Sequence, residues 1–314
     1  MLIDKIYISS FIRTTERAAY GAFLFKGKGD KISADQSAVD EMRTQLNKIN
    51  MRGKIVIGEG ELDEAPMLYI GEKVGNKSGE EFDIAVDPLE GTNFTAKNLP
   101  NALSVLAVTR KDNLLHAPDT YMEKIAIGPG LPKNLVDLDF SVEKNIKLLS
   151  DAKSISPDKL TACVLERPRH ERIIDSLNSM GVKIDFISDG DVSGVIAVAY
   201  PQRNIDIYLG VGGGPEGVLA AAALKCLGCQ MQTRLYFQNN NEKIRAKEFG
   251  LKNLHKKFNI EDMVKGDVIF CATGVTDGDM LKGIKDFGDT FSSETLVLHE
   301  GSKTNKIIKN RIRK

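Results

Sequence analysis

The second half of the chain alternates short apolar stretches with amphipathic ones, and this pattern limits the fold more than any other feature of the sequence. The apolar stretches have the length and the β-branched content of strands, and the segments between them have helical spacing. Strands alternating with helices are typical of a sheet covered by helices, so we predict the α/β class. The predicted strands are Thr161–Leu165, Val182–Ile187 and Ile205–Val211, and the predicted helices are His170–Met180, Val192–Ala199 and Pro215–Leu227.

The first half of the chain mixes helices and strands less regularly. Within the second of its helices, Val39, Met42 and Leu46 recur at three- and four-residue steps on one face. Helices are predicted at Ser10–Phe25 and Gln36–Ile49, and strands at Lys54–Ile57, Ile84–Val86, Leu103–Val108 and Tyr121–Ile125. The segment 132–157 is polar and mixed, so we expect the domain boundary there: an α+β metal and phosphate domain at 1–155 and an α/β substrate domain at 156–314. Gln238–Glu242 is predicted to be an exposed loop.

The charge balance and the cysteine content exclude several classes of protein. The 314 residues carry 43 basic and 43 acidic side chains, so no overall field draws the chain to nucleic acid or to anionic lipid. There is no apolar run of roughly 20 residues, as a membrane span requires, and no signal-peptide pattern. Four cysteines are too few for a disulfide framework. We therefore predict a cytoplasmic protein without nucleic-acid or membrane partners, whose basic last twelve residues form a solvated face.

Carboxylates stand beside the ends of several predicted elements. Asp35 precedes a helix, Glu59 and Asp87 end strands, Glu90 follows three residues later, and Glu216 comes after a glycine-rich loop. Carboxylates gathered in one place repel one another, and bound divalent cations remove that cost. Oxygen ligands favour hard cations, so we expect Mg²⁺ or Mn²⁺. The four histidines are scattered along the chain, which disfavours a zinc site.

The segment Asp87–Thr92, with the sequence Asp-Pro-Leu-Glu-Gly-Thr, is the strongest single candidate for a metal and phosphate centre. Its proline fixes a turn, and Gly91 allows the backbone to approach a phosphate closely. Thr92 offers a hydroxyl at the start of a helix or turn. The alternative is a simple acidic turn that contains a proline. Likewise, Gly58–Glu61 and the acidic Leu62–Pro66 either supply a ligand or form a solvated hairpin loop.

Two further segments are candidates for binding an anionic substrate. The three glycines of Gly212–Gly217 lie between a strand and a helix, where backbone N–H groups and the helix dipole favour an anion. The segment lacks the spacing of a P-loop or a dinucleotide fingerprint, and a purely structural turn is the alternative. Arg167–His170 places two guanidinium groups after a strand, which suits bidentate phosphate binding, with a surface turn as the alternative.

Two short motifs remain. The carboxylates of Asp189–Asp191 suit sugar hydroxyls or a metal better than a phosphate, and a helix N-cap is the alternative. Cys226 and Cys229 have C-x-x-C spacing, but only one such pair exists, and its leucine and glycine neighbours favour packing over zinc or redox chemistry.

Taken together and in this order, the motifs resemble those of the class II fructose-1,6-bisphosphatases of bacteria, within the lithium-sensitive, metal-dependent phosphatases. Asp87–Thr92 matches the D-P-[ILV]-[DE]-G-[ST] element of that wider group, although Asn93 stands where the family often has arginine. The segments that carry the resemblance are Lys31–Asp35, Ile55–Tyr69, Asp83–Thr92, Tyr121–Lys124, Arg167–His170, Asp189–Asp191 and Gly212–Gly217.

The resemblance implies a layered αβαβα sugar-phosphatase fold, a homo-oligomer and a set of site residues. It implies that Thr92, backed by Asp35, orients or deprotonates the attacking water. The implied metal ligands are Asp35, Glu59, Asp87, Glu90 and Glu216, and the implied substrate contacts are Glu90, Gly91, Thr92, Tyr121, Arg167, Pro168, Arg169, Asp189, Gly190, Asp191 and Gly213.

The resemblance also implies an activity, the metal-dependent removal of the 1-phosphate from fructose 1,6-bisphosphate in gluconeogenesis. Sedoheptulose-1,7-bisphosphatase activity, alone or in addition, is an alternative, because a sugar one carbon longer needs only slightly more room. An inositol monophosphatase is disfavoured, since Arg167 and Arg169 suggest a second phosphate. An alternative of another class is a sugar-phosphate-binding regulator without catalysis.

Overall fold

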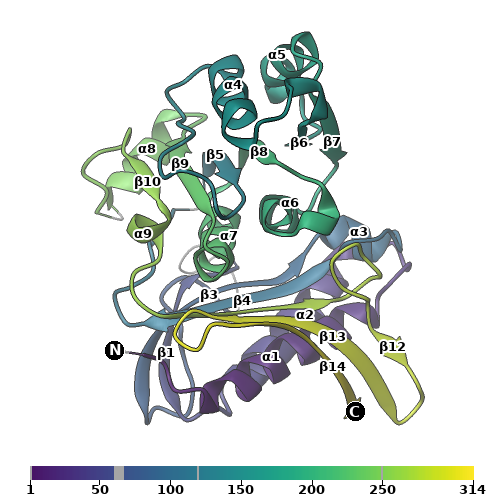
Figure 1. Ribbon diagram of the computed structural model, residues 1–314. Coiled ribbons are helices and arrows are strands. Elements are labelled where there is room, and N and C mark those ends of the chain that lie inside the picture. Colours follow the sequence, from purple (N-terminus) through teal and green to yellow (C-terminus); the bar gives the residue numbers. More distant parts are fainter. Residues whose placement is uncertain (1, 60–66, 119, 249) are drawn as a thin grey trace. The chain divides into compact units, whose positions relative to one another are not determined.

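The computed structural model describes residues 2–59, 67–118, 120–248 and 250–314, which fold as two compact units (Figure 1). Unit 1 contains residues 1–115 and 264–314, and unit 2 contains residues 116–263. This division corrects the boundary predicted at residue 155, because the last part of the chain returns to the first sheet. No helix among the described residues is long and apolar enough to cross a bilayer.

Unit 1 consists of one mixed sheet with helices packed on it. Among the described residues the sheet has eight strands in the order β12-β13-β11-β4-β3-β1-β2, and β14 also pairs with β13. The helices are α1 (Ile6–Phe23), α2 (Lys31–Leu46) and α3 (Thr92–Ala96). The strands are β1 (Met51–Ile57), β2 (Lys73–Val74), β3 (Glu80–Glu90), β4 (Leu103–Arg110), β11 (Val268–Gly274), β12 (Lys285–Asp286), β13 (Thr290–His299) and β14 (Thr304–Arg313).

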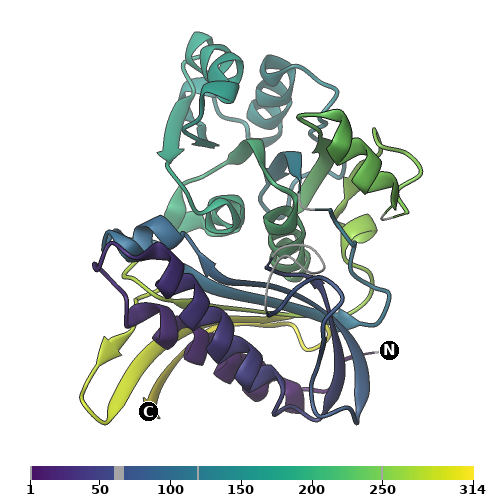
Figure 2. The ribbon, with the colours of Figure 1, turned by 180° about the vertical axis from the view of Figure 1, so that it is seen from behind.

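Helices α1 and α2 run across the same face of this sheet, as the view from behind shows (Figure 2). Their apolar positions meet Phe82, Ile84 and Val86 of β3 and Ile269 of β11 in one buried cluster. The two predicted helices are confirmed with earlier boundaries. Helix α2 begins at Lys31 because the side chain of Asp30 accepts a hydrogen bond from the Ser33 N–H at 2.9 Å, which caps the helix. Asp35 therefore lies within the helix rather than before it.

The described residues of unit 2 form a six-stranded sheet with helices on both faces. The strand order is β10-β9-β5-β8-β6-β7, in which β6, β7 and β8 run parallel and β5 runs antiparallel to β8. The strands are β5 (Tyr121–Ile127), β6 (Thr161–Leu165), β7 (Lys183–Ile187), β8 (Ile207–Gly213), β9 (Gln230–Tyr236) and β10 (Lys257–Asn259). The α-helices are α4 (Val142–Lys153), α5 (Glu171–Ser179), α6 (Asp191–Ile196), α7 (Gly214–Cys226), α8 (Asn240–Glu248) and α9 (Ile260–Met263). Short 3₁₀ turns are η1 (Pro157–Lys159), η2 (Pro168–His170), η3 (Ala197–Ala199) and η4 (Pro201–Arg203).

Side chains on the two faces of the second sheet alternate between two helical layers. Ile125, Ile127, Val164 and Leu209 pack with α4 and α5, and the opposite face carries α6 and α7. Unit 1 thus supplies one helical layer and one sheet, and unit 2 supplies a sheet between two helical layers. This confirms the predicted α/β class, with a helical layer and a sheet in unit 1 and three layers in unit 2.

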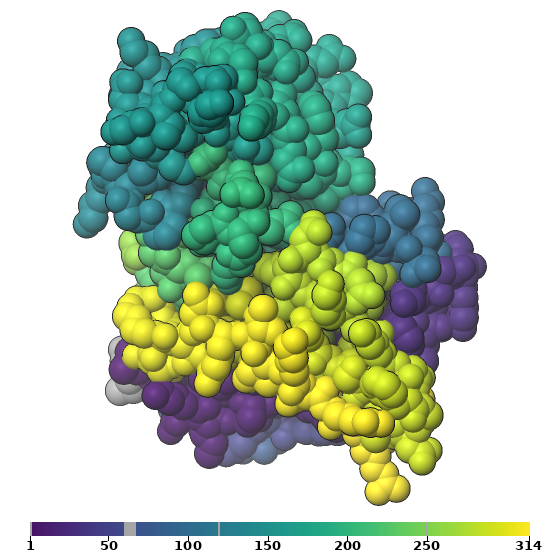
Figure 3. All heavy atoms as spheres, turned by 45° about the vertical axis from the view of Figure 1, so that its right-hand side comes forward, coloured from purple at the N-terminus to yellow at the C-terminus, as the bar shows by residue number. Residues whose placement is uncertain are grey.

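Two local predictions differ from the structure, and a third, the solvated face of the basic C-terminal residues, is confirmed. Asp87 and Pro88 do not stop β3, because a bulge between Asp87 and Glu90 absorbs the proline and pairing with β4 resumes at Glu90. Gln238–Glu242 is only partly a loop, since α8 begins at Asn240 and Asn239 caps it by accepting from the Glu242 N–H. The basic C-terminal residues form the strand β14, whose side chains are largely exposed, and Figure 3 shows this yellow segment on the surface.

Candidate active site

Acidic residues just after β1 and near the carboxyl end of β3 lie at one edge of the first sheet. The two strands are parallel neighbours, and Ile57 pairs with Ala85. Two residues further along each strand stand Glu59 and Asp87, so the register carries both to the same edge, on strands about 4.8 Å apart. The N–H of Glu59 also donates to the carbonyl oxygen of Leu68 at 3.0 Å. Glu61 to Pro66 lie outside the described residues.

The bulge in β3 lies between Asp87 and Glu90, and Gly91 and Thr92 follow it. Glu90 is 4% exposed and pairs with Leu103 of β4. Gly91 has φ 79° and ψ 50°, a left-handed conformation that favours glycine. A Cβ there would also lie 2.7 Å from Cδ2 of Phe94. The glycine therefore allows the strand to turn at once into α3, which begins at Thr92 as predicted.

Asp35 lies on α2, the helix that packs against both β3 and α3. Its carboxyl group is partly buried, and this desolvation raises the pKa of Asp35 above its ordinary value. A bound cation would offset the cost of this desolvation and stabilise the ionised carboxylate. Asp35 is thus carried toward the elements that bear Asp87 and Thr92 by the packing of α2.

The donor chemistry of these residues suits a hard divalent cation. In unit 1 the predicted ligands Asp35, Glu59, Asp87 and Glu90 offer only carboxylate oxygens. The described part of the chain does not, however, hold a ready-made group of three or more metal-ligating side chains. The residue types and their place at the edge of the sheet fit Mg²⁺ or Mn²⁺.

In unit 2, the sheet topology collects the remaining predicted residues at one edge. Because β6, β7 and β8 are parallel, the segments after their carboxyl ends share that edge, and the first residue of the antiparallel β5 joins them. Tyr121 pairs with Gly213 across β5 and β8. The predicted residues at this edge are Tyr121, Arg167, Pro168, Arg169, Asp189, Gly190, Asp191, Gly213 and Glu216.

Arg169 is held over the ring of Tyr121. Its guanidinium carbon lies 4.8 Å from the ring centroid, within the range of a cation–π contact. Nε and Nη2 of Arg169 donate to the carbonyl oxygen of Val211 at 3.0 and 2.7 Å. A guanidinium has five N–H groups, so others remain to bind an anion. Arg167 donates to the carbonyl oxygen of Glu166 at 2.9 Å and is half-buried.

His170 fixes this arginine segment to β8, a role that the sequence did not indicate. The Val211 N–H donates to Nε2 of His170 at 2.8 Å, so Nδ1 carries the ring proton and donates to the carbonyl oxygen of Leu165 at 2.6 Å. Both bonds are buried, and burial lowers the pKa of His170. The neutral imidazole thereby joins the ends of β6 and β8.

Asp191 begins α6 and is engaged within the protein. Its carboxylate forms a buried ion pair with Lys124 of β5 and accepts the hydroxyl hydrogen of Tyr208 of β8. Burial raises the pKa of Tyr208, so the phenol stays protonated and donates. Asp189 is half-buried and accepts from the Gly190 N–H at 3.1 Å. Lys124 and Tyr208 are the partners that sequence reasoning missed.

The glycine-rich loop leaves room for two carboxylates. A Cβ on Gly212 would lie 2.1 Å from Oδ2 of Asp191, and a Cβ on Gly213 would lie 1.9 Å from Oε2 of Glu216. A side chain at either position would therefore require the facing carboxylate to move. Glu216 lies in the first turn of α7, whose N-terminal proline suits that position. The glycines thus allow the two acidic side chains to keep these positions.

The C-x-x-C pair behaves as packing residues. Cys229 is buried, and burial raises the pKa of its thiol to about 12. A thiol that stays protonated is a poor metal ligand and a poor nucleophile.

The sequence matches, over residues 5–312, the family described as "Bacterial fructose-1,6-bisphosphatase, glpX-encoded". This match places the chain among the phosphoric monoester hydrolases. Within that class, the chain belongs to the bacterial class 2 fructose-1,6-bisphosphatase family, which acts on a sugar bisphosphate with the help of a metal.

Two curated relatives have sequences similar to nearly the whole chain. The class 2 fructose-1,6-bisphosphatase of Haemophilus influenzae is 44% identical over 316 residues, covering 96% of this chain and 94% of that protein. The fructose-1,6-bisphosphatase 1 class 2 of Escherichia coli K12 is 43% identical over 308 residues, covering 94% and 91%.

Similarity to solved structures is weak. The extragenic suppressor protein suhB from Bartonella henselae has a TM-score of 0.34 at 11% identity, covering 62% of this chain and 74% of that one. The inositol monophosphatase from Anabaena has a TM-score of 0.31 at 11% identity, covering 62% and 72%. Similarity at this level supports no conclusion about activity.

Proposed function

We propose that this chain hydrolyses the 1-phosphate of fructose 1,6-bisphosphate to give fructose 6-phosphate and phosphate, in gluconeogenesis, with Mg²⁺ or Mn²⁺ as cofactor. Beside the family membership, one observation carries the proposal. The parallel register of β1 and β3 brings Glu59 and Asp87 to one edge, where the bulge adds Glu90 and Thr92.

The proposed metal ligands are the five carboxylates that the family resemblance implies, namely Asp35, Glu59, Asp87, Glu90 and Glu216. When bound, divalent cations neutralise charge on the phosphoryl oxygens and lower the pKa of a coordinated water. The chain's own part is to hold these carboxylates ionised in partly desolvated positions. The rigid bulge and the left-handed Gly91 fix the direction in which Glu90 and Thr92 follow Asp87.

Thr92 is proposed to orient or deprotonate the attacking water, with Asp35 as its partner. Thr92 is the first residue of α3, and α2, which bears Asp35, packs on α3. The raised pKa of Asp35 suits a carboxyl group that accepts a proton from a hydroxyl. Water attacks the phosphorus in line with the leaving sugar oxygen, which departs with a proton as the product hydroxyl.

The edge of the second sheet is proposed to hold the sugar and the 6-phosphate. Arg169, fixed by Tyr121 and the Val211 carbonyl, anchors the phosphate together with Arg167, and Pro168 between them restrains the turn. Asp189 accepts from the sugar hydroxyls. Asp191 and Gly190 act by setting the position of that loop, because Lys124 and Tyr208 already engage the Asp191 carboxylate. Glu90, Gly91, Tyr121 and Gly213 complete the proposed contacts.

The location and the assembly are proposed on other grounds. A sugar bisphosphate substrate supports a cytoplasmic enzyme. A homo-oligomer is proposed from the family resemblance alone.

The test is the release of phosphate from fructose 1,6-bisphosphate with Mn²⁺. Asp87→Asn and Glu90→Gln are each expected to lower kcat/KM at least about a hundredfold, since several kcal/mol of transition-state stabilisation are lost. Glu81→Gln, an exposed carboxylate of the same strand, is the matched control and should retain the rate. A chelator should abolish release, and Mn²⁺ should restore it. Activity near that of wild type in Asp87→Asn contradicts the proposal.

Two alternatives are separated by the same assay. Release from sedoheptulose 1,7-bisphosphate at a comparable kcat/KM would add a second substrate. Binding of fructose 1,6-bisphosphate without release, with Mn²⁺ present, would indicate the non-catalytic regulator instead.

A further inference from the structure

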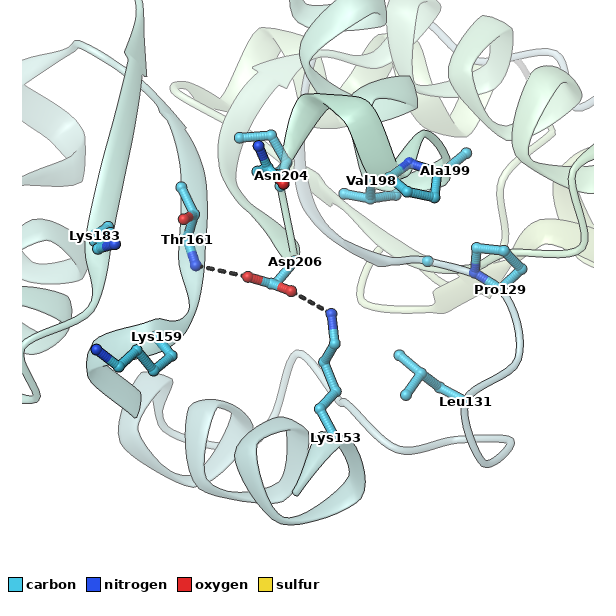
Figure 4. A pocket seen from close by; sticks show the side chains of 13 residues that line it. Pro129, Leu131, Lys153, Lys159, Thr161, Lys183, Val198, Ala199, Asn204 and Asp206 are labelled. Atoms are coloured by element: carbon cyan, nitrogen blue, oxygen red, sulfur yellow. Dashed lines mark hydrogen bonds and ion pairs between the residues drawn. The ribbon is translucent and has the colours of Figure 1, made fainter. Parts of the chain in front are cut away.

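A cavity of about 580 Å³ opens in unit 2 at the amino ends of its parallel strands (Figure 4). Thr161 begins β6, Lys183 begins β7, and Asp206 immediately precedes β8. Helix α4 contributes its last residue, Lys153, and the turn η1 contributes Lys159. All of these residues line the cavity.

This cavity lies at the opposite edge of the sheet from the candidate active site. Arg167 and Asp189 follow the carboxyl ends of β6 and β7, whereas the cavity lies at their amino ends. Each strand has five residues, which span about 17 Å at roughly 3.3 Å per residue. A molecule in the cavity therefore does not occupy the candidate active site.

The cavity has an excess of positive charge among the described residues that line it. Asp206 is already engaged, because its carboxylate accepts from the Thr161 N–H at 2.7 Å and forms an ion pair with Lys153. In Figure 4 the Lys153 ammonium group points toward Asp206, while Lys159 and Lys183 lie on the side of Thr161. Among the described residues, Lys159 forms an ion pair with the exposed Asp158, at 3.6 Å, a contact of little energy. Lys159 and Lys183 can therefore turn toward an anion.

The wall facing the lysines is apolar. Pro129, Leu131, Val198 and Ala199 form it, and Figure 4 shows them on the side opposite Lys159 and Lys183. Pockets with apolar walls and a few convergent polar groups are the usual form of small-molecule sites. A bound molecule would thus contact lysine ammonium groups at one end and apolar side chains at the other.

We propose that this cavity binds a small organic dianion, a phosphate or phosphonate group attached to an apolar body. The charged group lies between Lys159 and Lys183, and the apolar body lies against Leu131 and Val198. Asp206 and Lys153 form the floor and remain paired to each other.

The test uses phenylphosphonate, which carries both parts and has no ester bond to hydrolyse. Its dissociation constant is measured by calorimetry with the full chain and EDTA, so that no metal supports binding elsewhere. Methylphosphonate, which keeps the charge and lacks the ring, should bind about tenfold more weakly, because the apolar contact is lost. Lys159→Met and Lys183→Met should each weaken phenylphosphonate about tenfold, since a charged hydrogen bond is removed.

The matched control is Lys147→Met, an exposed lysine of α4 that does not line the cavity. It removes the same charge from unit 2 and should leave the dissociation constant within twofold. The thermal midpoints of all three variants without the probe show whether each is folded. Equal affinity of wild type and Lys183→Met, or an equal loss in Lys147→Met, overturns the proposal. So does the absence of heat with wild-type protein at millimolar probe.

Discussion

Replacing Lys124 with methionine should destabilise unit 2 strongly, because it leaves a buried carboxylate without its cation. Lys124 is 1% exposed and Asp191 is 7% exposed. Lys124 belongs to β5 and Asp191 to α6, and Tyr208 of β8 donates to the same carboxylate. The three residues tie two strands and a helix together beneath the candidate substrate loop.

The magnitude follows from burial. Removing one partner of a buried ion pair costs about 3–5 kcal/mol, since the remaining charge stays desolvated. At roughly 2–4 °C per kcal/mol, the thermal midpoint should fall by about 6–20 °C. Tyr208→Phe removes one buried hydrogen bond and should cost about 1–3 kcal/mol.

The assay is a double-mutant cycle by urea unfolding, with kcat/KM measured on each variant. Lys124→Met and Asp191→Asn should each be strongly destabilising, and the double variant should cost less than the sum of the two. Lys256→Met breaks an exposed ion pair with Asp262 in the same unit and should cost at most about 1 kcal/mol. A loss below about 1 kcal/mol in Lys124→Met, or strict additivity in the cycle, would refute this reasoning.

Three further outcomes are expected. Arg169→Ala should raise KM for fructose 1,6-bisphosphate about tenfold or more while kcat changes little, since a charged contact to the distal phosphate is lost. Arg172→Ala, at an exposed position on α5, is the control and should leave KM unchanged. An unchanged KM in Arg169→Ala would contradict the proposal that Arg169 binds the 6-phosphate. Gly213→Ala should lower kcat/KM and reduce the free energy of unfolding by about 1–3 kcal/mol, because the new Cβ would lie 1.9 Å from Oε2 of Glu216 and displace that side chain. A crystal structure of the variant with Glu216 unmoved would contradict this. Because the pKa of His170 is lowered in the folded protein, its imidazole is protonated at a higher pH in the unfolded chain than in the folded one. The contribution of His170 to the free energy of unfolding is therefore full above about pH 6.5 and is lost as the pH falls toward the folded pKa. His170→Gln should lack this loss in unfolding curves between pH 7 and 5, and an identical dependence of the free energy of unfolding on pH in both proteins would show another cause.

The local elements were largely predictable because their signals are short-range. Strand β6 begins and ends where its apolar run does, and α7 follows its glycine and proline signals within a residue. Helix α3 begins at Thr92 because Gly91 turns the chain there. Carboxylates after apolar strands also indicated where the two candidate edges lie, since residues beyond parallel strands share an edge.

What escaped prediction depends on pairing between distant segments. Nothing local shows that β11 pairs with β4, from Val268 opposite Thr109 to Gly274 opposite Leu103. Nothing in the sequence around Lys124 indicates that this lysine is buried. Its burial is explained by the ion pair with Asp191, which lies 67 positions further along the chain. The continuation of β3 past its proline likewise depends on β4, which resumes pairing with Glu90.

The return of the chain to its first sheet has a consequence for synthesis on the ribosome. The antiparallel pair β4 and β11 is interrupted by all of unit 2, and the two ends of that segment are joined by the bridge between Leu114 and Val264. As the polypeptide emerges, residues 116–263 are complete while the first sheet still lacks β11, β12, β13 and β14. The acidic edge of β1 and β3 therefore belongs to an incomplete sheet until β11 to β14 have left the exit tunnel.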